Sequence, residues 1–211
     1  MLAECCRQVA NRYRIREYKA YLRRKRARLQ NRNFTIISSN CVGAFMYRDL
    51  GLPYLSPTID LGVGMNEFVK MAENLRWYMD QEIVRIEETY ECPVGLLGDV
   101  VIKFAHYKSY DEAAAKWNER KKRINWDNLF LIGTEKGDCN YETVKRFDQL
   151  SYQNKVVFTH IQYPEFHSAY HIKGFEKEKE LGVLVGYKKQ LLLRRYMDDF
   201  DYVAFLNGSL Y

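Results

Sequence analysis

The sequence predicts an α/β fold in which a largely parallel β-sheet is flanked by helices, with a basic helix at the N-terminus. Short apolar runs of strand length alternate along the chain with helical patterns of roughly 10–18 residues, as in βαβ units. The composition is that of a globular protein, with 47% hydrophobic and 28% charged residues among 211. A chain of this length can bury one substantial core.

A basic helix is expected over residues 5–30. Its apolar residues recur at helical spacing, with no Gly or Pro between them, at Ile15, Tyr18, Leu22 and Leu29. Residues 1–33 hold 11 Lys and Arg against two acidic residues, a balance of +9, whereas the remaining chain has 22 basic and 25 acidic residues, a balance of −3. We therefore divide the chain into a basic helical arm (1–33) and an α/β domain (34–211).

The first half of this domain opens with a strand and two helices. Phe34–Ile37 is a short run of strand type, and a short amphipathic helix over 42–50 ends at the next glycine. A helix over 66–83 is indicated by apolar residues at helical spacing, namely Phe68, Ala72, Leu75 and Met79. The buried run 100–105 predicts a second strand, which ends at His106.

The second half continues the alternation. Ser109 and Glu112 form a capping-box pattern that opens a helix reaching Arg123. Further strands are expected at 129–132, 156–158 and 183–185, and further helices at 142–150 and 198–206. This order of strands and helices predicts that most of the strands are parallel.

Polar residues follow the ends of the predicted strands, where parallel-sheet proteins place their sites. In chain order they are Ser39, Asn40 and Cys41; His106, Tyr107 and Lys108; Thr134, Glu135 and Lys136; and Thr159 and His160. A thiol becomes a reactive thiolate when a base or a positive charge lies nearby, so Cys41 with His106 or His160 forms a candidate catalytic pair. The alternative interpretation of Cys41 is a buried, inert thiol.

The candidate substrate-binding residues are Ser39, Asn40, Gly43, Asp99, Lys108, Arg123 and Arg146. Gly43 opens a helix just after the candidate thiol, where backbone N–H groups can bind a phosphate or an oxyanion, although an ordinary tight turn also explains it. Arg123 and Arg146 could grip a phosphate or carboxylate, or could be solvated helix residues. The acids at 198–201 could hold a divalent cation or cap a helix, and we expect no bound metal.

Several classes of protein are excluded by these patterns. The five Cys are irregularly spaced without a CxxC pair, which argues against a disulfide framework and a structural zinc site. The longest uncharged stretch, 33–47, is too short to span a membrane, and the arm lacks the apolar core of a secretory signal. The basic residues lie in the arm and not on the domain, which argues against nucleic acid. We expect a cytoplasmic protein.

Many separated blocks of the sequence resemble one bacterial family. They are Asn33–Cys41, Tyr47–Tyr54, Ser56–Pro57, Pro93–Gly95, Gly98–Asp99, His106–Lys108, Lys116–Trp117, Arg120–Trp126, Arg146–Asp148, Tyr163–Glu165 and Ile172–Glu176. On these blocks the chain resembles the DUF1919 family over residues 33–207. The resemblance implies an α/β fold and a role in capsule or exopolysaccharide biosynthesis.

The resemblance also implies an enzyme that transfers an acetyl or similar small group onto a sugar. Acetyl-CoA would be the donor, a sugar or lipid-linked saccharide the acceptor, and no cofactor would be bound. His106 or His160 would deprotonate a sugar hydroxyl, or Cys41 would carry the acyl group, while Asn40 and the Gly43 backbone stabilise the oxyanion. The alternatives are a metal-dependent glycosyl- or phospho-group transferase of the same pathway, using Asp99 or the acids at 198–201, and a non-enzymatic assembly protein docked on the membrane.

The arm has two interpretations. Its cations could hold the protein at the anionic inner face of the cell membrane, as in interfacial helices. Alternatively, it is a solvated helix that packs one stripe of side chains on the domain or on a partner chain.

Overall fold

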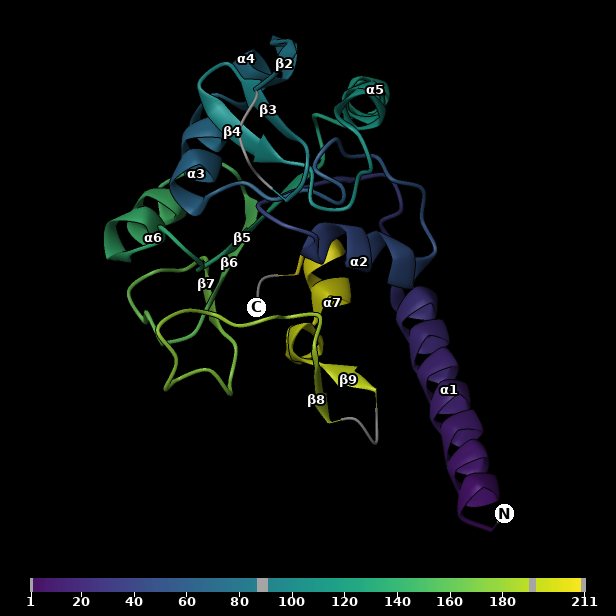
Figure 1. Ribbon diagram of the computed structural model, residues 1–211. Helices are drawn as coiled ribbons and strands as arrows, with labels where there is room; N and C mark the ends of the chain where they lie inside the picture. Colours follow the sequence, from purple (N-terminus) through teal and green to yellow (C-terminus); the bar gives the residue numbers. More distant parts are fainter. Residues whose placement is uncertain (1, 87–90, 190–192, 210–211) are drawn as a thin grey trace.

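A four-stranded parallel sheet forms the centre of the computed structural model, which describes residues 2–86, 91–189 and 193–209 (Figure 1). Its strands lie in the order β1 (Thr35–Ser38), β5 (Leu129–Thr134), β6 (Asn154–Thr159) and β7 (Ala169–His171). All three strand pairings are parallel. The predicted α/β fold with a largely parallel sheet is confirmed.

Both faces of this sheet are buried, which explains why its strands read as continuous apolar runs in the sequence. Ile37, Leu131 and Val157 belong to one hydrophobic cluster. Phe130 and Phe158 belong to a second cluster on the opposite face. Successive side chains of a strand point to opposite faces, so each run of apolar residues supplies both layers.

Helices cover each face of the sheet. On the first face lie α3 (Met65–Glu73) and α6 (Tyr141–Asp148), with α4 (Leu75–Asp80) and α5 (Tyr110–Lys121) beside them. On the second face lie α2 (Val42–Leu50) and α7 (Tyr202–Leu206). The single helix predicted over 66–83 is wrong in one respect, because Asn74 leaves helical geometry, with φ −139°, and divides it into α3 and α4.

A second, antiparallel sheet corrects the prediction for residues 100–105. β2 (Ile83–Arg85), β3 (Val94–Leu97) and β4 (Val100–Lys103) pair as an antiparallel meander, so β4 is not a strand of the parallel sheet. The strand predicted at 183–185 is also wrong. This stretch is irregular, and Val183 is 62% exposed.

The C-terminal part adds a small hairpin and a short helical turn. The hairpin consists of β8 (Tyr187–Lys189) and β9 (Arg194–Arg195). The 3-10 turn η2 (Tyr196–Asp199) follows it and precedes α7. The helix predicted over 198–206 is therefore shorter than expected and interrupted at Phe200, which has extended geometry.

The second half of the N-terminal helix α1 (Leu2–Arg28) packs against the domain. Its first turns project away from the body, as Figure 1 shows. Lys25 and Leu29, at and just after its end, are buried, and Arg26 donates from Nε to the Asp49 carbonyl at 2.7 Å. Within the described residues, none of the helices has both the length and the apolar character of a membrane span.

A buried ion-pair network, formed by Lys25, Asp49, Arg195, Asp198 and Tyr202, joins α1 to α2 and to the C-terminal segment. Asp198 Oδ1 accepts from Lys25 Nζ at 3.0 Å and from Arg195 Nη2 at 3.1 Å. Arg195 also forms an ion pair with Asp49, which accepts from the Tyr202 hydroxyl at 2.9 Å. Burial acts to raise the pKa of Asp198, but the Arg195 hydrogen bond and the Lys25 charge hold it at about 2. The network fixes the second half of α1 on the domain.

Candidate active site

A histidine–carboxylate pair lies at the carboxyl edge of the parallel sheet, where β5 and β6 end. Glu135 follows β5 and His160 follows β6 directly. His160 Nδ1 lies 2.6 Å from Glu135 Oε2, and the His160 backbone N–H donates to the same oxygen at 2.8 Å. The Tyr163 hydroxyl donates to Glu135 Oε1 at 3.0 Å. Neighbouring parallel strands thus deliver both partners to one point.

Burial gives this pair its chemical character. The side chains of Glu135 and His160 are only 6% and 13% exposed. A buried carboxylate needs hydrogen bonds, and Glu135 receives three. When Nδ1 donates to Glu135, the neutral ring carries its lone pair on Nε2, which has no hydrogen-bond partner within the described residues. A ring held in this way can accept a proton at Nε2.

An aromatic platform lies beside the pair and consists of Tyr141, Tyr163 and Phe166. The ring centroids of Tyr141 and Tyr163 are 6.0 Å apart, and that of Phe166 lies 5.2 Å from Tyr141 and 5.8 Å from Tyr163. Tyr141 is 47% exposed and opens the platform to solvent. Burial, with the nearby Glu135 charge, raises the pKa of Tyr163, so its hydroxyl stays protonated and can donate.

A second polar cluster, formed by Ser39, Asn40 and Thr134, closes the turn between β1 and α2. Asn40 Nδ2 donates to Thr134 Oγ1 at 2.7 Å, and the hydroxyls of Ser39 and Thr134 lie 3.1 Å apart. Asn40 Oδ1 accepts from the Val42 N–H at 3.0 Å. A pocket of about 160 Å³ lies beside this cluster, lined by Asn40, Cys41, Val42, Thr134, Lys136 and residues 181–185.

Cys41 lines the pocket beside the second cluster and is not paired with a histidine within the described residues. Its Sγ donates to the Leu61 carbonyl at 3.8 Å, and no hydrogen bond joins it to a histidine in the described part of the chain. Burial, with the nearby Asp60 charge, raises the pKa of the thiol to about 11. Thr134 and Glu135 are successive residues, whose side chains point to opposite sides. The Cys41 pocket and His160 therefore lie on different sides of the sheet edge.

Gly43 has a packing role. A Cβ at this position would lie 2.6 Å from Ser38 Oγ and 3.0 Å from Ile36 Cγ2. The absence of a side chain therefore lets α2 approach β1 closely. The residue is buried, and the Cys41 pocket is lined by its neighbour Val42.

The remaining predicted site residues are exposed, and no hydrogen bond or ion pair joins them to Glu135 or His160 within the described residues. They are His106 in the turn after β4, Lys108 before α5, Asp99 in the β3–β4 turn, Arg123 after α5 and Arg146 on α6. Three of them have ion-pair partners elsewhere: Asp99 with Lys70, Arg123 with Glu119 and Arg146 with Glu73. His106 follows β4, a strand of the antiparallel sheet, whereas His160 follows β6, a strand of the parallel sheet.

The acidic residues at 198–201 form ion pairs within the protein and cap α7. Asp198 pairs with Lys25 and Arg195, Asp199 with Lys188, and Asp201 with Arg28. Asp201 also caps α7 by accepting from the Ala204 N–H at 3.2 Å. Residues 2–86, 91–189 and 193–209 contain no group of three or more His, Cys, Asp or Glu able to hold a metal ion.

Sequence reasoning identified Glu135 and His160 as strand-end residues but chose only the histidine. A signal for the pair was present, because both residues directly follow buried runs. Tyr163 and the aromatic platform were not predicted as parts of the site. Their partners come from α6 and from the segment between β6 and β7, and no local pattern brings these together.

Comparison with known proteins assigns the family. The protein-family model described as "Domain of unknown function (DUF1919)" matches residues 12–207. The match includes most of α1, so it begins before residue 33, where the resemblance in the sequence starts. A protein of Haemophilus influenzae (strain ATCC 51907 / DSM 11121 / KW20 / Rd), described as an uncharacterized protein, is 40% identical over 182 residues, covering 86% of this chain and 88% of that protein. The chain belongs to the DUF1919 family.

Proposed function

We propose that this protein is a transferase of surface-polysaccharide biosynthesis that moves an acetyl or similar acyl group onto a sugar hydroxyl. The observation that carries the proposal is the His160–Glu135 pair at the carboxyl edge of the sheet, beside an open aromatic platform. A base next to a surface suited to a polyhydroxylated ligand is what hydroxyl acylation requires.

The chemical step uses His160 directly. Nε2 takes the proton of the sugar hydroxyl while its oxygen attacks the carbonyl carbon of an acyl thioester such as acetyl-CoA. The new C–O bond forms as the C–S bond breaks, and the imidazolium returns the proton to the departing thiolate. Glu135, 2.6 Å from Nδ1, stabilises the imidazolium and holds the ring in one orientation.

The aromatic platform supports a sugar as the acceptor. The C–H faces of a sugar ring pack on aromatic rings, while its hydroxyl groups need polar partners at the edge. The exposed Tyr141 ring offers such a face, and the Tyr163 hydroxyl is bonded to the carboxylate that orients the base. Sugar and base would then meet at one place.

The environment of Cys41 favours direct transfer of the acyl group to the sugar over a route through an acyl-enzyme. Nucleophilic attack needs the thiolate, and burial raises the pKa of this thiol to about 11. Its hydrogen bond is to the Leu61 carbonyl and not to a base. We therefore assign Cys41 no covalent role.

The test is to incubate the protein with acetyl-CoA and a panel of free, nucleotide-linked and lipid-linked sugars, and to detect acetylated product by mass spectrometry. His160→Asn should reduce the rate by at least about 100-fold, because general-base catalysis contributes 10²–10⁴-fold. His106→Asn is the matched control, since this histidine is exposed in the turn after β4, and it should retain the wild-type rate.

Two further variants test the arrangement around the base. Glu135→Gln keeps the shape of the side chain but removes its charge, and it should reduce the rate while the fold is retained. Tyr163→Phe should act in the same direction but less, since Glu135 keeps both bonds to His160. No acetylated product with any sugar, or equal rates for His160→Asn and His106→Asn, would overturn the proposal.

A further inference from the structure

We propose that α1 binds an anionic lipid surface through one face, the basic face. It is defined by five cations and two apolar residues: Arg12, Arg16, Lys19, Arg23 and Arg26, with Ile15 and Leu22. This inference does not depend on the proposed transferase activity, because it concerns where the protein sits. Its readout is vesicle binding, so its failure leaves the chemistry of His160 untested and unaffected.

The basic face and the side of α1 that packs on the domain are different sides of one helix. The cations of the basic face recur at alternating spacings of four and three, which keeps them on one side of an α-helix. Tyr21 and Lys25, on the packed side, contact Asp198 at 3.1 Å and 3.0 Å. The buried network therefore holds α1 in a fixed rotation that leaves Arg12, Arg16, Lys19 and Arg23 exposed, with Arg26 at the edge next to the domain.

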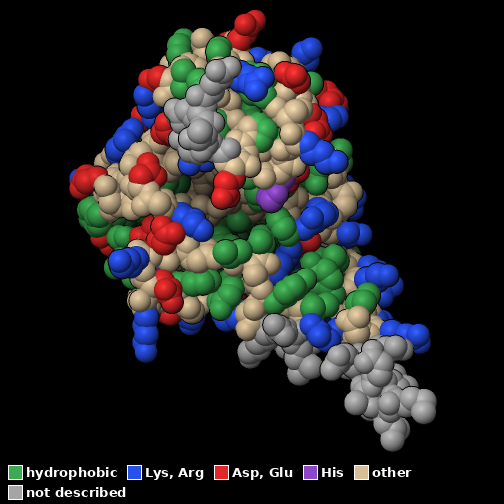
Figure 2. All heavy atoms as spheres, viewed as in Figure 1, with side chains coloured by type: hydrophobic (Ala, Val, Ile, Leu, Met, Phe, Trp, Pro, Cys, Tyr) green, Lys and Arg blue, Asp and Glu red, His purple; other side chains and the backbone are tan. Residues whose placement is uncertain are grey.

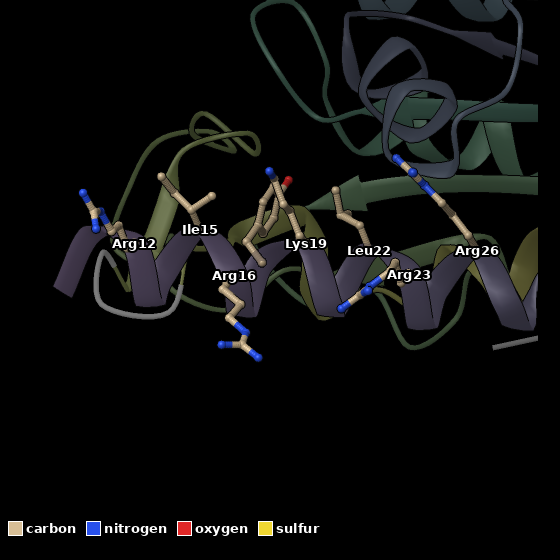
Figure 3. Close-up of a pocket in the computed structure, with 8 residues that line it drawn as sticks. Arg12, Ile15, Arg16, Lys19, Leu22, Arg23 and Arg26 are labelled. Atoms are coloured by element: carbon tan, nitrogen blue, oxygen red, sulfur yellow. The ribbon is translucent and has the colours of Figure 1, made fainter. Parts of the chain in front are cut away.

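Figure 3 shows how the side chains of this face lie. Arg12, Ile15, Lys19, Leu22 and Arg26 project to one side of α1 in this view, and Arg16 and Arg23 project to the other. An open groove of about 850 Å³ runs along these residues, and all of its lining side chains come from α1. In Figure 2, Lys and Arg side chains line the margin of the molecule where α1 runs.

The charge on this helix is not balanced by the protein. Residues 12–28 contain nine Lys and Arg and one acid, Glu17. Only Lys25 and Arg28 form ion pairs within the described residues, with Asp198 and Asp201. Arg26 donates to the Asp49 carbonyl, but Arg12, Arg16, Lys19 and Arg23 form no ion pair within the described residues and can pair with an external anion. Charge complementarity selects a negatively charged partner.

The geometry favours a membrane over other anionic partners. The face extends from residue 12 to residue 26, roughly 21 Å at the helical rise, as a straight row that matches a plane of phosphates. Ile15 is 43% exposed beside these cations. Apolar side chains among cations can be buried at the boundary between lipid headgroups and acyl chains, whereas a soluble polyanion has no apolar region to bury them.

The test uses the full chain and vesicles of phosphatidylglycerol mixed with phosphatidylcholine, or of phosphatidylcholine alone. Arg16→Glu/Arg23→Glu reverses two cations of the basic face that are exposed and form no ion pair within the described residues. The matched control is Arg85→Glu/Lys122→Glu, which changes the net charge equally at exposed positions on β2 and just after α5. Thermal unfolding confirms that both variants fold.

Wild type and control should co-sediment with the anionic vesicles and not with the neutral ones, with binding that weakens as salt rises. Arg16→Glu/Arg23→Glu should bind at least about 30-fold more weakly, from roughly fivefold per basic residue near a charged surface. Equal loss in the two double variants would reveal a net-charge effect and overturn the proposal, as would equal binding to neutral vesicles.

Ile15→Gln separates the membrane from a soluble polyanion. It should weaken vesicle binding several-fold while leaving binding to heparin, a soluble polyanion, unchanged. If vesicle binding is also unchanged, the face binds anions without inserting, and the membrane proposal fails in favour of a polyanionic partner. Truncation of the arm is not an equivalent test, because it removes Lys25 from the buried network.

Discussion

Asp198→Asn tests the buried network that fixes α1 on the domain. The side chains of Asp198 and Arg195 are 3% exposed and that of Lys25 is 6% exposed, so the substitution leaves Lys25 buried without a carboxylate and Arg195 with Asp49 alone. Breaking a buried ion pair on one side costs about 3–5 kcal/mol. We expect a loss of that size in the free energy of unfolding at pH 7.

The pH dependence of this loss follows from the pKa of Asp198. In the folded protein it is about 2, against an ordinary value of 3.8. Because the folded value is the lower one, the stabilisation is fully present above pH 4 and is lost as the pH falls through 2. A shift of this size corresponds to about 2 kcal/mol. The stability difference between wild type and Asp198→Asn should narrow by about that amount between pH 6 and pH 2.

Urea unfolding at several pH values, followed by the fluorescence of the buried Trp117, measures both quantities. Carboxylates other than Asp198 titrate in both proteins and cancel in the difference. Lys25→Met is the companion variant. Burial lowers the pKa of Lys25, so this variant removes a desolvated cation while Arg195 still pairs with Asp198. It should lower the free energy of unfolding by less than half as much as Asp198→Asn. A loss below about 1 kcal/mol for Asp198→Asn at pH 7 would refute the reasoning.

Three other predictions concern packing and the thiol. Gly43→Ala should lower the free energy of unfolding by about 1–3 kcal/mol in urea titrations, because its Cβ would meet Ser38 Oγ at 2.6 Å; wild-type stability would contradict the close packing of α2 on β1. Phe158→Ala should cost about 3–5 kcal/mol in the same assay, because this ring is fully buried between Tyr170 and Phe200. Iodoacetamide should alkylate Cys41 at pH 7.5 about 100-fold more slowly in the folded protein than in urea, since its pKa rises from 9.0 to about 11; equal rates by peptide mass spectrometry would show an accessible thiolate.

Local patterns in the sequence predicted the parallel sheet because its strands are buried on both faces. Ile36, Phe130 and Phe158 lie in continuous apolar runs, which are typical of strands with both faces buried. The same pattern misled at Val100–Ile102, since a buried antiparallel strand gives an identical run and only its pairing with β3 distinguishes it. At residues 183–185 the apolar run has no partner strand, and only Leu184 is buried.

The sequence also indicated part of the candidate site, because two of its residues directly follow buried parallel strands. His160 directly follows a strand whose parallel neighbour ends at Glu135, so the strand-end rule suffices for both. The pairing of Cys41 with a histidine required knowledge of which side of the edge each residue occupies. That depends on register and on the packing around Asp60 and Leu61, which leave no mark on residue spacing.

The contacts between the end of α1 and Asn207 have a consequence for synthesis. Asn207 accepts the N–H groups of Gln30 and Asn31 at 2.9 Å and 3.2 Å and donates to the Arg28 carbonyl at 3.0 Å, across more than 170 residues. At ribosomal speed, on the order of 10–40 s pass between the emergence of α1 and that of its partners. Helix α1 is therefore made well before the segment that fixes it on the domain. Until then Lys25 and Arg28 lack their partners Asp198 and Asp201, so the buried network forms late in folding.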